Sequence, residues 1–237
     1  MKSIGLIGGM SWESTLLYYR IINREVARRR GGLRSAPMQI ASLDFEEIAI
    51  RQRRGAWDEM AAILSRSARQ LVSAGAACVL ICTNTMHRVA PEVRQAIPVP
   101  LLHIGEITAR AIRQAGMVRV ALLGTRFTME QDFYADVLRG HGIDCLTPDA
   151  DGRETVHRII FDELCRGEVR DESRLALLAV IDDLVARGAQ GVVLGCTELP
   201  LILSPGDRGI PLFDTTRLHA LAAVDFALDE PNLGIAA

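Results

Sequence analysis

Short apolar runs alternate along this chain with longer stretches in which apolar residues recur at helical spacing. The runs of strand length are Ser3–Ile7, Met38–Ser42, Ala77–Ile81, Leu101–His103, Arg119–Leu123, Gly191–Leu194 and Leu212–Phe213. Between them lie amphipathic stretches such as Trp57–Ala74, where apolar residues return every three or four positions. This alternation predicts an α/β fold in which mainly parallel sheets are flanked by helices.

The pattern repeats once along the chain. Gly75-Ala76 and Gly188-Ala189 precede two of the strands, and Leu6-Ile7-Gly8-Gly9 matches Leu122-Leu123-Gly124-Thr125. The two pairs lie at nearly the same offset, 188 − 75 = 113 and 124 − 8 = 116. We therefore expect two pseudo-symmetric lobes with an active cleft between them. The expected parts are an N-terminal lobe, residues 1–105, a C-terminal lobe, residues 106–212, and a last strand and helix, residues 213–237, that pack back on the first lobe.

Composition narrows the location and the partners of the protein. The net charge of −2 over 237 residues gives no bulk attraction to nucleic acid or to an anionic membrane. The first ten residues look like a strand and lack the features of a signal peptide. Five cysteines without framework spacing indicate reduced thiols. We expect a cytoplasmic protein with a small-molecule partner, no nucleic acid and no membrane.

Two cysteine turns follow matching apolar strands in the two halves. Cys82-Thr83-Asn84-Thr85 follows Ala77–Ile81, and Cys196-Thr197-Glu198 follows Gly191–Leu194. Each turn places a thiol at the carboxyl end of a parallel sheet, which is where open α/β sheets bind ligands. A pair of them, one in each half, suggests two thiols that face each other as proton donor and proton acceptor.

The residues of these turns favour proton transfer at a carbon next to a carboxylate. A thiol has a reference pKa of about 8.5, and a helix amino terminus favours its thiolate. Thr83, Asn84, Thr85 and Thr197 are of the types that cap helices and hydrogen-bond carboxylates. One thiolate would remove an α-proton while the opposite thiol protonates the other face, which inverts the carbon. This chemistry requires no metal and no pyridoxal phosphate, so we expect no cofactor.

The remaining cysteines and two neighbouring polar residues have simpler interpretations. Cys78 shares a strand face with Cys82 but lies deeper, as a core residue would. Cys145 and Cys165 have no cap-like context and are interpreted as structural. His87 either orients substrate or thiol, or is a packed or capping histidine. Glu198 is either a partner that tunes Cys196 or a favourable acid in a first helical turn.

The first glycines of the chain do not form a nucleotide motif. Gly5-Leu6-Ile7-Gly8-Gly9-Met10 lacks the G-x-G-x-x-G spacing, and its glycines would let the backbone approach a small substrate. The sequence contains no Walker lysine, no H-E-x-x-H and no paired C-x-x-C, which disfavours nucleotide and zinc sites.

At these residues the chain resembles the aspartate/glutamate racemase family of cofactor-independent amino-acid racemases. The resemblance rests on Gly8-Gly9-Met10, Cys82-Thr83-Asn84-Thr85-Met86-His87, Leu123-Gly124-Thr125 and Gly195-Cys196-Thr197-Glu198. Longer stretches, such as Ser11-Trp12-Glu13-Ser14-Thr15 and Thr128-Met129-Glu130-Gln131-Asp132, are similar to the broad-specificity amino-acid racemase branch.

The resemblance implies a two-lobed enzyme, commonly a homodimer, in which Cys82 and Cys196 are the two acid/base residues. It also assigns the substrate contacts. Asn84, Thr85, Thr125 and Thr197 would hold the carboxylate and amino groups, and Met10 and Gln52 would border the side-chain pocket.

One departure from the family pattern bears on the substrate. Archaeal aspartate racemases carry a lysine where this chain has Cys165, so the contact to a second carboxylate would fall to Arg166 or to an arginine of residues 51–54. The resemblance therefore implies a substrate that is aspartate, glutamate or one of a broader set of amino acids. Within the same superfamily, a maleate isomerase-like reaction with a nucleophilic cysteine is an alternative, and a non-catalytic amino-acid-binding protein is another. Two intact Cys-Thr turns disfavour a decarboxylase, which needs one cysteine.

Overall fold

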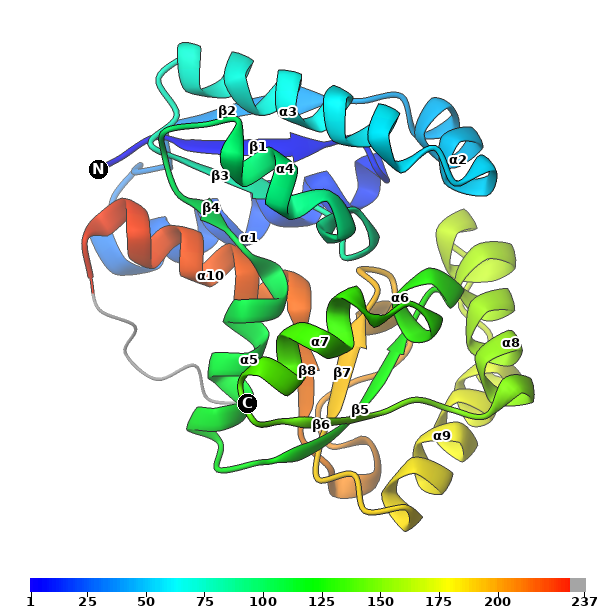
Figure 1. Ribbon diagram of the computed structural model, residues 1–237. Coiled ribbons are helices and arrows are strands. Elements are labelled where there is room, and N and C mark those ends of the chain that lie inside the picture. Colours follow the sequence, from blue (N-terminus) through cyan, green and yellow to red (C-terminus); the bar gives the residue numbers. More distant parts are fainter. Residues whose placement is uncertain (231–237) are drawn as a thin grey trace. The chain divides into compact units, whose positions relative to one another are not determined.

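The computed structural model describes residues 1–230, which form two compact units (Figure 1). Unit 1 holds residues 1–104 together with the C-terminal stretch that begins at Thr216, and unit 2 holds Gly105–Thr215. Each unit is a parallel sheet flanked by helices, so the predicted α/β fold with two lobes is confirmed. Residues 231–237 of the expected C-terminal segment lie outside the described residues.

Unit 1 is built on a sheet of four parallel strands in the order β2-β1-β3-β4. Its elements are β1 (Ile4–Gly8), α1 (Trp12–Arg30), β2 (Met38–Ser42), α2 (Phe45–Arg54), α3 (Trp57–Ser73), β3 (Cys78–Ile81), the 3-10 helix η1 (Thr85–Val89), α4 (Ala90–Gln95), β4 (Leu101–Leu102) and α10 (Thr215–Leu228). The strand order reverses between β1 and β3, and such a switch point leaves a crevice at the carboxyl ends of the two strands.

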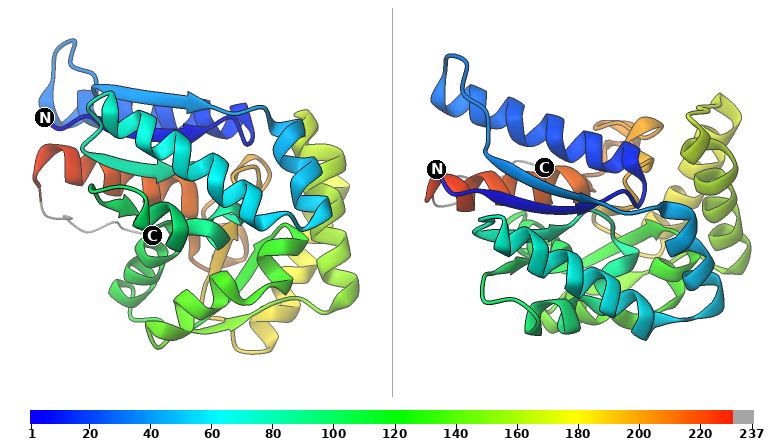
Figure 2. Two further views of the ribbon diagram at one scale, coloured as in Figure 1. Left: turned by 45° about the horizontal axis from the view of Figure 1, so that its top comes forward. Right: turned by 90° about the horizontal axis from the view of Figure 1, so that it is seen from above.

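The two faces of this sheet bury alternate residues of each strand. Leu80 and Cys82 pack with α1 and α10 on one face, whereas Val79 and Ile81 pack with α3 and α4 on the other. Figures 1 and 2 show α1 and α10 side by side on their face of the sheet. Cys78 belongs to the same cluster as Cys82 and is completely buried, which confirms its interpretation as a core residue.

Unit 2 repeats this topology with the strand order β6-β5-β7-β8. Its elements are α5 (Ile104–Gln114), β5 (Arg119–Gly124), α6 (Arg126–Glu130), α7 (Asp132–Gly140), β6 (Asp144–Leu146), α8 (Ala150–Arg158), η2 (Ile159–Glu163), η3 (Leu164–Arg166), α9 (Asp171–Ala186), β7 (Val192–Gly195), η4 (Leu199–Leu201), η5 (Asp207–Gly209) and β8 (Leu212–Asp214). The order reverses between β5 and β7, so the crevice expected here lies at the ends of those strands. Helices α8 and α9 pack on the β7 face that carries Val192, Leu194 and Cys196.

Two strands differ from the sequence-based expectation. Strand β6 was not predicted, because it is a short edge strand that begins with an exposed Asp144 and lacks a continuous apolar run. Strand β8 was expected to pack back on the first lobe with the helix that follows it. It pairs instead with β7 in unit 2, with Val193 opposite Phe213, and the chain enters unit 1 only with α10.

No helix within residues 1–230 has both the length and the apolar character needed to cross a membrane.

The turn after β1 is packed against the chain itself. A Cβ atom on Gly8 would lie 2.4 Å from Oγ1 of Thr15, and one on Gly9 would lie 2.1 Å from the carbonyl oxygen of Leu43. Gly9 also has a positive φ of 83° and donates its N–H to Thr15 Oγ1 at 2.8 Å. These glycines therefore bring β1 close to α1 and β2.

Two glycine substitutions separate the cost of crowding from the cost of a positive φ. Gly75 has a φ of 93°, and nothing lies within 4 Å of a Cβ placed on it. We expect Gly75→Ala to lower the free energy of unfolding by about 1–2 kcal/mol through backbone strain alone. Gly9→Ala adds the clash with Leu43 and should lose at least ~2 kcal/mol more. Urea denaturation of both variants measures the difference, and equal losses would contradict the packing role of Gly9.

Candidate active site

Cys82 ends β3 at the switch point of unit 1. Its side chain is 1% exposed. Its backbone N–H donates to the carbonyl of Ile7 at 2.9 Å, which continues the pairing of β3 with β1. Its own carbonyl accepts a hydrogen bond from Ser14 Oγ at 2.9 Å, in the first turn of α1. Both backbone groups of Cys82 are thus fixed, and the thiol is left for chemistry.

The residues after Cys82 form a tight 3-10 turn. Thr83 is half-buried, whereas Asn84 and Thr85 are buried. They lead into η1 and then α4, so Cys82 does not stand at the start of an α-helix as the sequence suggested. A short 3-10 helix has few aligned peptide dipoles, and its favourable effect on a thiolate is correspondingly small.

The ring of His87 fixes this turn through hydrogen bonds to the backbone. Its Nδ1–H donates to the carbonyl of Thr83 at 2.8 Å, and its Nε2 accepts from the N–H of Ile104 at 3.1 Å. Both ring nitrogens are used by the backbone, so the structure favours the packed and capping interpretation of His87. Its ring lies 4.6 Å from that of His103 and 5.7 Å from that of His219 between centroids.

His219 on α10 is fixed in the same way. Its Nε2–H donates to the carbonyl of Leu102 at 2.8 Å, and its Nδ1 accepts from the hydroxyl of Tyr18 at 2.8 Å. Burial lowers the pKa of His219 to about 3. Burial also lowers the pKa of His87 well below its usual value, and the neighbouring histidines add to the effect. These hydrogen bonds therefore require neutral rings.

Met10 and Gln52 lie in one part of unit 1, near Met86 of η1. Met10 packs in the same buried cluster as Met86 and Ile48. Gln52 on α2 directs its Nε2 towards Sδ of Met86 at 3.3 Å. The structure thus brings Met10 and Gln52 together with Met86 in one part of unit 1. Met86 belonged to the family motif but had no predicted role.

The arginines beside Gln52 are engaged elsewhere. Arg51 binds Glu47 at 3.5 Å and Glu59 at 3.2 Å, and Arg53 binds Glu46 at 3.0 Å. These ion pairs keep both guanidinium groups at the surface of α2 and α3. They are therefore poorly placed to meet a second carboxylate of a substrate.

Cys196 ends β7 at the switch point of unit 2 and contacts a carboxylate. Its Sγ lies 3.0 Å from Oε2 of Glu198, to which the thiol donates, and the hydroxyl of Thr197 donates to the same oxygen at 2.7 Å. All three residues are buried. The structure thus favours the interpretation of Glu198 as a partner that tunes Cys196.

Thr125 stands at the neighbouring strand end. Gly124 pairs with Gly195 in the register of β5 and β7, so Thr125 and Cys196 follow strand residues that lie side by side. A Cβ on Gly124 would lie 3.0 Å from the carbonyl oxygen of Gly195, a tight contact that a larger residue could make only if the strands moved slightly apart. Thr125 Oγ1 is 3.3 Å from Oγ1 of Thr128.

The pKa values of both turn cysteines move in the direction opposite to the sequence-based expectation. Burial raises the pKa of Cys82. Burial also raises the pKa of Cys196, and the negative charge of Glu198 raises it further. At neutral pH both thiols are protonated in this state of the protein, because desolvation of a thiolate outweighs the dipole of a short turn.

Two residues near these cysteines escaped the sequence analysis. Ser14 was only part of a family motif, although a serine in the first turn of a helix next to a strand end is a typical donor to a turn carbonyl. Cys165 was assigned a structural role. Burial and the charge of Glu198 raise its pKa to about 12, so it lies near the Cys196 turn.

Together, these features define the class: two α/β units of one topology, each with a buried Cys-Thr turn after its third strand. The chain belongs to the Asp/Glu/Hydantoin racemase family, whose model matches residues 7–223. The resemblance seen in the sequence is therefore confirmed. The predicted enzyme class, an amino-acid racemase among the isomerases, is supported by the racemases among its relatives.

Three relatives show the extent of the similarity. The chain is 26% identical over 167 residues to the broad specificity amino-acid racemase RacX of Bacillus subtilis (strain 168), which covers 70% of this chain and 72% of RacX. A Yersinia pestis crystal structure assigned to the Asp/Glu racemases is 50% identical, with a TM-score of 0.91 over 96% of this chain and 100% of that one. An aspartate racemase homologue from Pyrococcus horikoshii OT3 is 34% identical, with a TM-score of 0.84 over the same shares.

The buried histidines predict a loss of stability in mild acid. Their folded pKa values lie below the unfolded value of about 6.5, so the unfolded chain binds more protons once the pH falls below 6.5. Stability is then retained above pH 6.5 and is lost progressively towards the folded pKa. His219 alone should remove about 2 kcal/mol between pH 6.5 and pH 5.

Urea denaturation at pH 7, 6 and 5 measures this slope. His219→Gln keeps a donor and an acceptor but does not titrate. Its loss of stability between pH 6.5 and pH 5 should therefore be smaller than that of the wild type by about 2 kcal/mol. His141→Gln, at an exposed position, is the matched control and should leave the slope unchanged. An unaltered slope in His219→Gln would show that the network does not control acid stability.

Proposed function

We propose that this chain is a cofactor-independent amino-acid racemase in which Cys82 and Cys196 exchange protons with opposite faces of one α-carbon. The observation that carries this proposal is the equivalence of the two turns. Each cysteine is buried, follows the third strand of its unit and stands where the strand order reverses. Such positions are where sheets of this type bind ligands. A substrate held by both units would therefore meet one thiol from each.

The different surroundings of the two thiols support different roles, with Cys196 as the base and Cys82 as the acid. Cys196 can pass its proton to Glu198, which accepts its hydrogen bond at 3.0 Å and becomes a neutral acid. The resulting thiolate removes the α-proton of the substrate, and its S–H bond is restored. Cys82, kept protonated by burial, donates its proton to the opposite face and becomes a thiolate. Proton exchange with Glu198 and solvent then resets the pair for the next turnover.

The hydroxyl and amide groups beside the cysteines would hold the substrate. In unit 1 they are Thr83, Asn84 and Thr85, and in unit 2 they are Thr125 and Thr197. Oriented donors of this kind stabilise the enediolate that forms when the α-proton leaves, because negative charge develops on the carboxylate oxygens.

The residues around Gln52 on α2 favour a substrate with an uncharged side chain. Met10, Gln52 and Met86 would border the side chain, and none of them is a cation. Arg51 and Arg53 are held in ion pairs. A second carboxylate would then be desolvated without a counter-charge, which is costly. The name of RacX, a broad specificity amino-acid racemase, is consistent with this preference.

We also propose that the enzyme works in the cytoplasm as a homodimer. The five cysteines, Cys78, Cys82, Cys145, Cys165 and Cys196, are all free thiols, which suits a reducing compartment. The homodimer follows from the family resemblance, and light scattering of the purified protein tests it.

Replacing either proposed catalytic thiol should abolish racemisation. We expect Cys82→Ser and Cys196→Ser each to lower kcat by about 10³-fold, because a serine hydroxyl is a far weaker acid at this position. Cys145→Ser on β6 is the control and should keep full activity. Chiral chromatography and NMR of α-proton exchange in deuterated buffer, without added cofactor, measure both steps. Full racemisation by either turn variant would disprove the two-thiol mechanism.

The preference for uncharged side chains can be tested with one amino-acid panel. We expect kcat/KM for homoserine to exceed that for aspartate by at least about tenfold, because burial of an unpaired carboxylate is unfavourable. Gln52→Arg should raise the aspartate-to-homoserine ratio by supplying a cation. Arg54→Gln, at an exposed site on the same helix, should leave the ratio unchanged. A loss of aspartate turnover in Arg54→Gln would instead identify Arg54 as the missing contact.

A further inference from the structure

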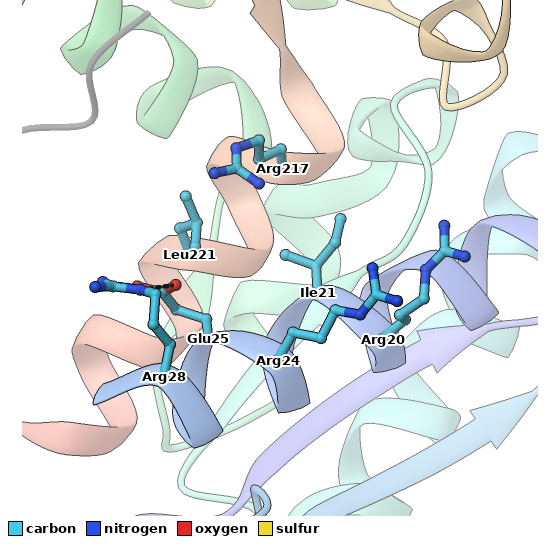
Figure 3. Close-up of a pocket in the computed structure, with 7 residues that line it drawn as sticks. All are labelled: Arg20, Ile21, Arg24, Glu25, Arg28, Arg217 and Leu221. Carbon is cyan, nitrogen blue, oxygen red and sulfur yellow. Dashed lines mark hydrogen bonds and ion pairs between the residues drawn. The ribbon is translucent and has the colours of Figure 1, made fainter. Parts of the chain in front are cut away.

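A groove in unit 1, between α1 and α10, is lined mainly by arginines (Figure 3). It has a volume of about 290 Å³. Its lining residues are Arg20, Ile21, Arg24, Glu25, Arg28, Arg217 and Leu221. Figure 3 shows Arg20 and Arg24 projecting from α1, with Arg217 on α10 across from them. No residue of the two cysteine turns lines this groove, so what it binds does not depend on the proposed function.

The acid in the groove does not balance its positive charge. Glu25 accepts hydrogen bonds from Arg28 at 2.7 and 2.9 Å and from Arg29 at 2.7 Å. These guanidinium groups hold the pKa of Glu25 at about 2, so its charge is fully committed to them. Within residues 1–230, Arg20 and Arg24 form no ion pair. The groove therefore presents an excess of positive charge.

The spacing of the arginines along α1 destabilises this helix. Arg20, Arg24 and Arg28 are spaced four residues apart and so lie on one face of the helix, about 6 Å apart along its axis. Like charges at this spacing repel each other and destabilise a helix. Elsewhere on the surface, arginines such as Arg119 and Arg153 each have an acidic partner. In this row Arg28 is paired with Glu25, whereas Arg20 and Arg24 add like charge without an ion pair, and such a local conflict is of the kind that marks a functional site.

We propose that the groove binds a small linear polyphosphate anion, either as a free polyphosphate or as the phosphate chain of a nucleotide. The planar fork of arginine donates two parallel hydrogen bonds to a phosphate and is preferred over lysine for this purpose. Successive phosphates along a chain match guanidinium groups that follow one another along α1. A compact tricarboxylate concentrates its charge and matches the row less well. Ile21 and Leu221 form an apolar floor that would exclude water from these hydrogen bonds.

Calorimetric titration with inorganic tripolyphosphate tests the proposal. The wild-type chain should bind it more tightly than it binds citrate or orthophosphate. Arg20→Gln/Arg24→Gln should weaken tripolyphosphate binding by about tenfold or more, since two charge-assisted contacts are lost. Arg66→Gln/Arg69→Gln removes the same charge from exposed positions on α3 and should change the affinity less than twofold. A parallel titration with ATP identifies the source, because tighter binding of ATP would indicate a nucleotide.

The same variants show whether tripolyphosphate binding depends on the groove or only on the net charge of the protein. Equal weakening by both double variants, or no binding of tripolyphosphate by the wild type, would overturn the proposal. Thermal unfolding provides the check on folding. Without ligand, Arg20→Gln/Arg24→Gln should melt no lower than the wild type, because it relieves repulsion on α1. With tripolyphosphate, the melting temperature should rise for the wild type and for Arg66→Gln/Arg69→Gln only.

Discussion

Burial of two thiols at the ends of β3 and β7 is the constraint on which the rest of the structure depends. A thiolate without solvent is unfavourable, and the pKa values of Cys82 and Cys196 rise accordingly. Chemistry at these sulfurs therefore needs groups that take up or supply a proton at short range. Glu198 is such a group for Cys196.

The two cysteine turns are positioned by different contacts. In unit 1 the carbonyl of Cys82 is bound by Ser14, and the carbonyl of Thr83 is bound by the neutral ring of His87. In unit 2 a close approach of two glycines, Gly124 and Gly195, sets the spacing of the strand ends. Different devices thus position equivalent thiols. The similarity of the two units lies in their topology, whereas the local chemistry has diverged.

The sequence predicted what depends on regular burial and missed what depends on irregular contacts. Runs such as Ala77–Ile81 were recognised to within one residue because central parallel strands are apolar on both faces. Strand β6 escaped because Asp144 and its neighbours are partly exposed. The α-helical context expected after Cys82 was wrong because the chain forms η1 first.

For a related reason, the sequence could not predict that the pKa values of the two thiols are raised. The sequence shows that threonines and an asparagine follow Cys82, but it does not show how completely the strand end is covered. That cover comes from residues far away in the chain, including those of α10. The arginine-lined groove between α1 and α10 could not be predicted either, because these two helices are separated by most of the sequence.

The discontinuity of unit 1 has a consequence for its biosynthesis. The cluster that buries Cys82 includes Ala220, Ala223 and Val224 of α10, which follow all of unit 2 in the chain. A ribosome that synthesises this protein releases β1 to β4 long before it releases α10, and domains generally fold as they emerge. Unit 2 can complete its core while one face of the unit 1 sheet is covered by α1 but not yet by α10. Cys82 therefore stays without the cover that α10 provides until residues 215–228 have been synthesised.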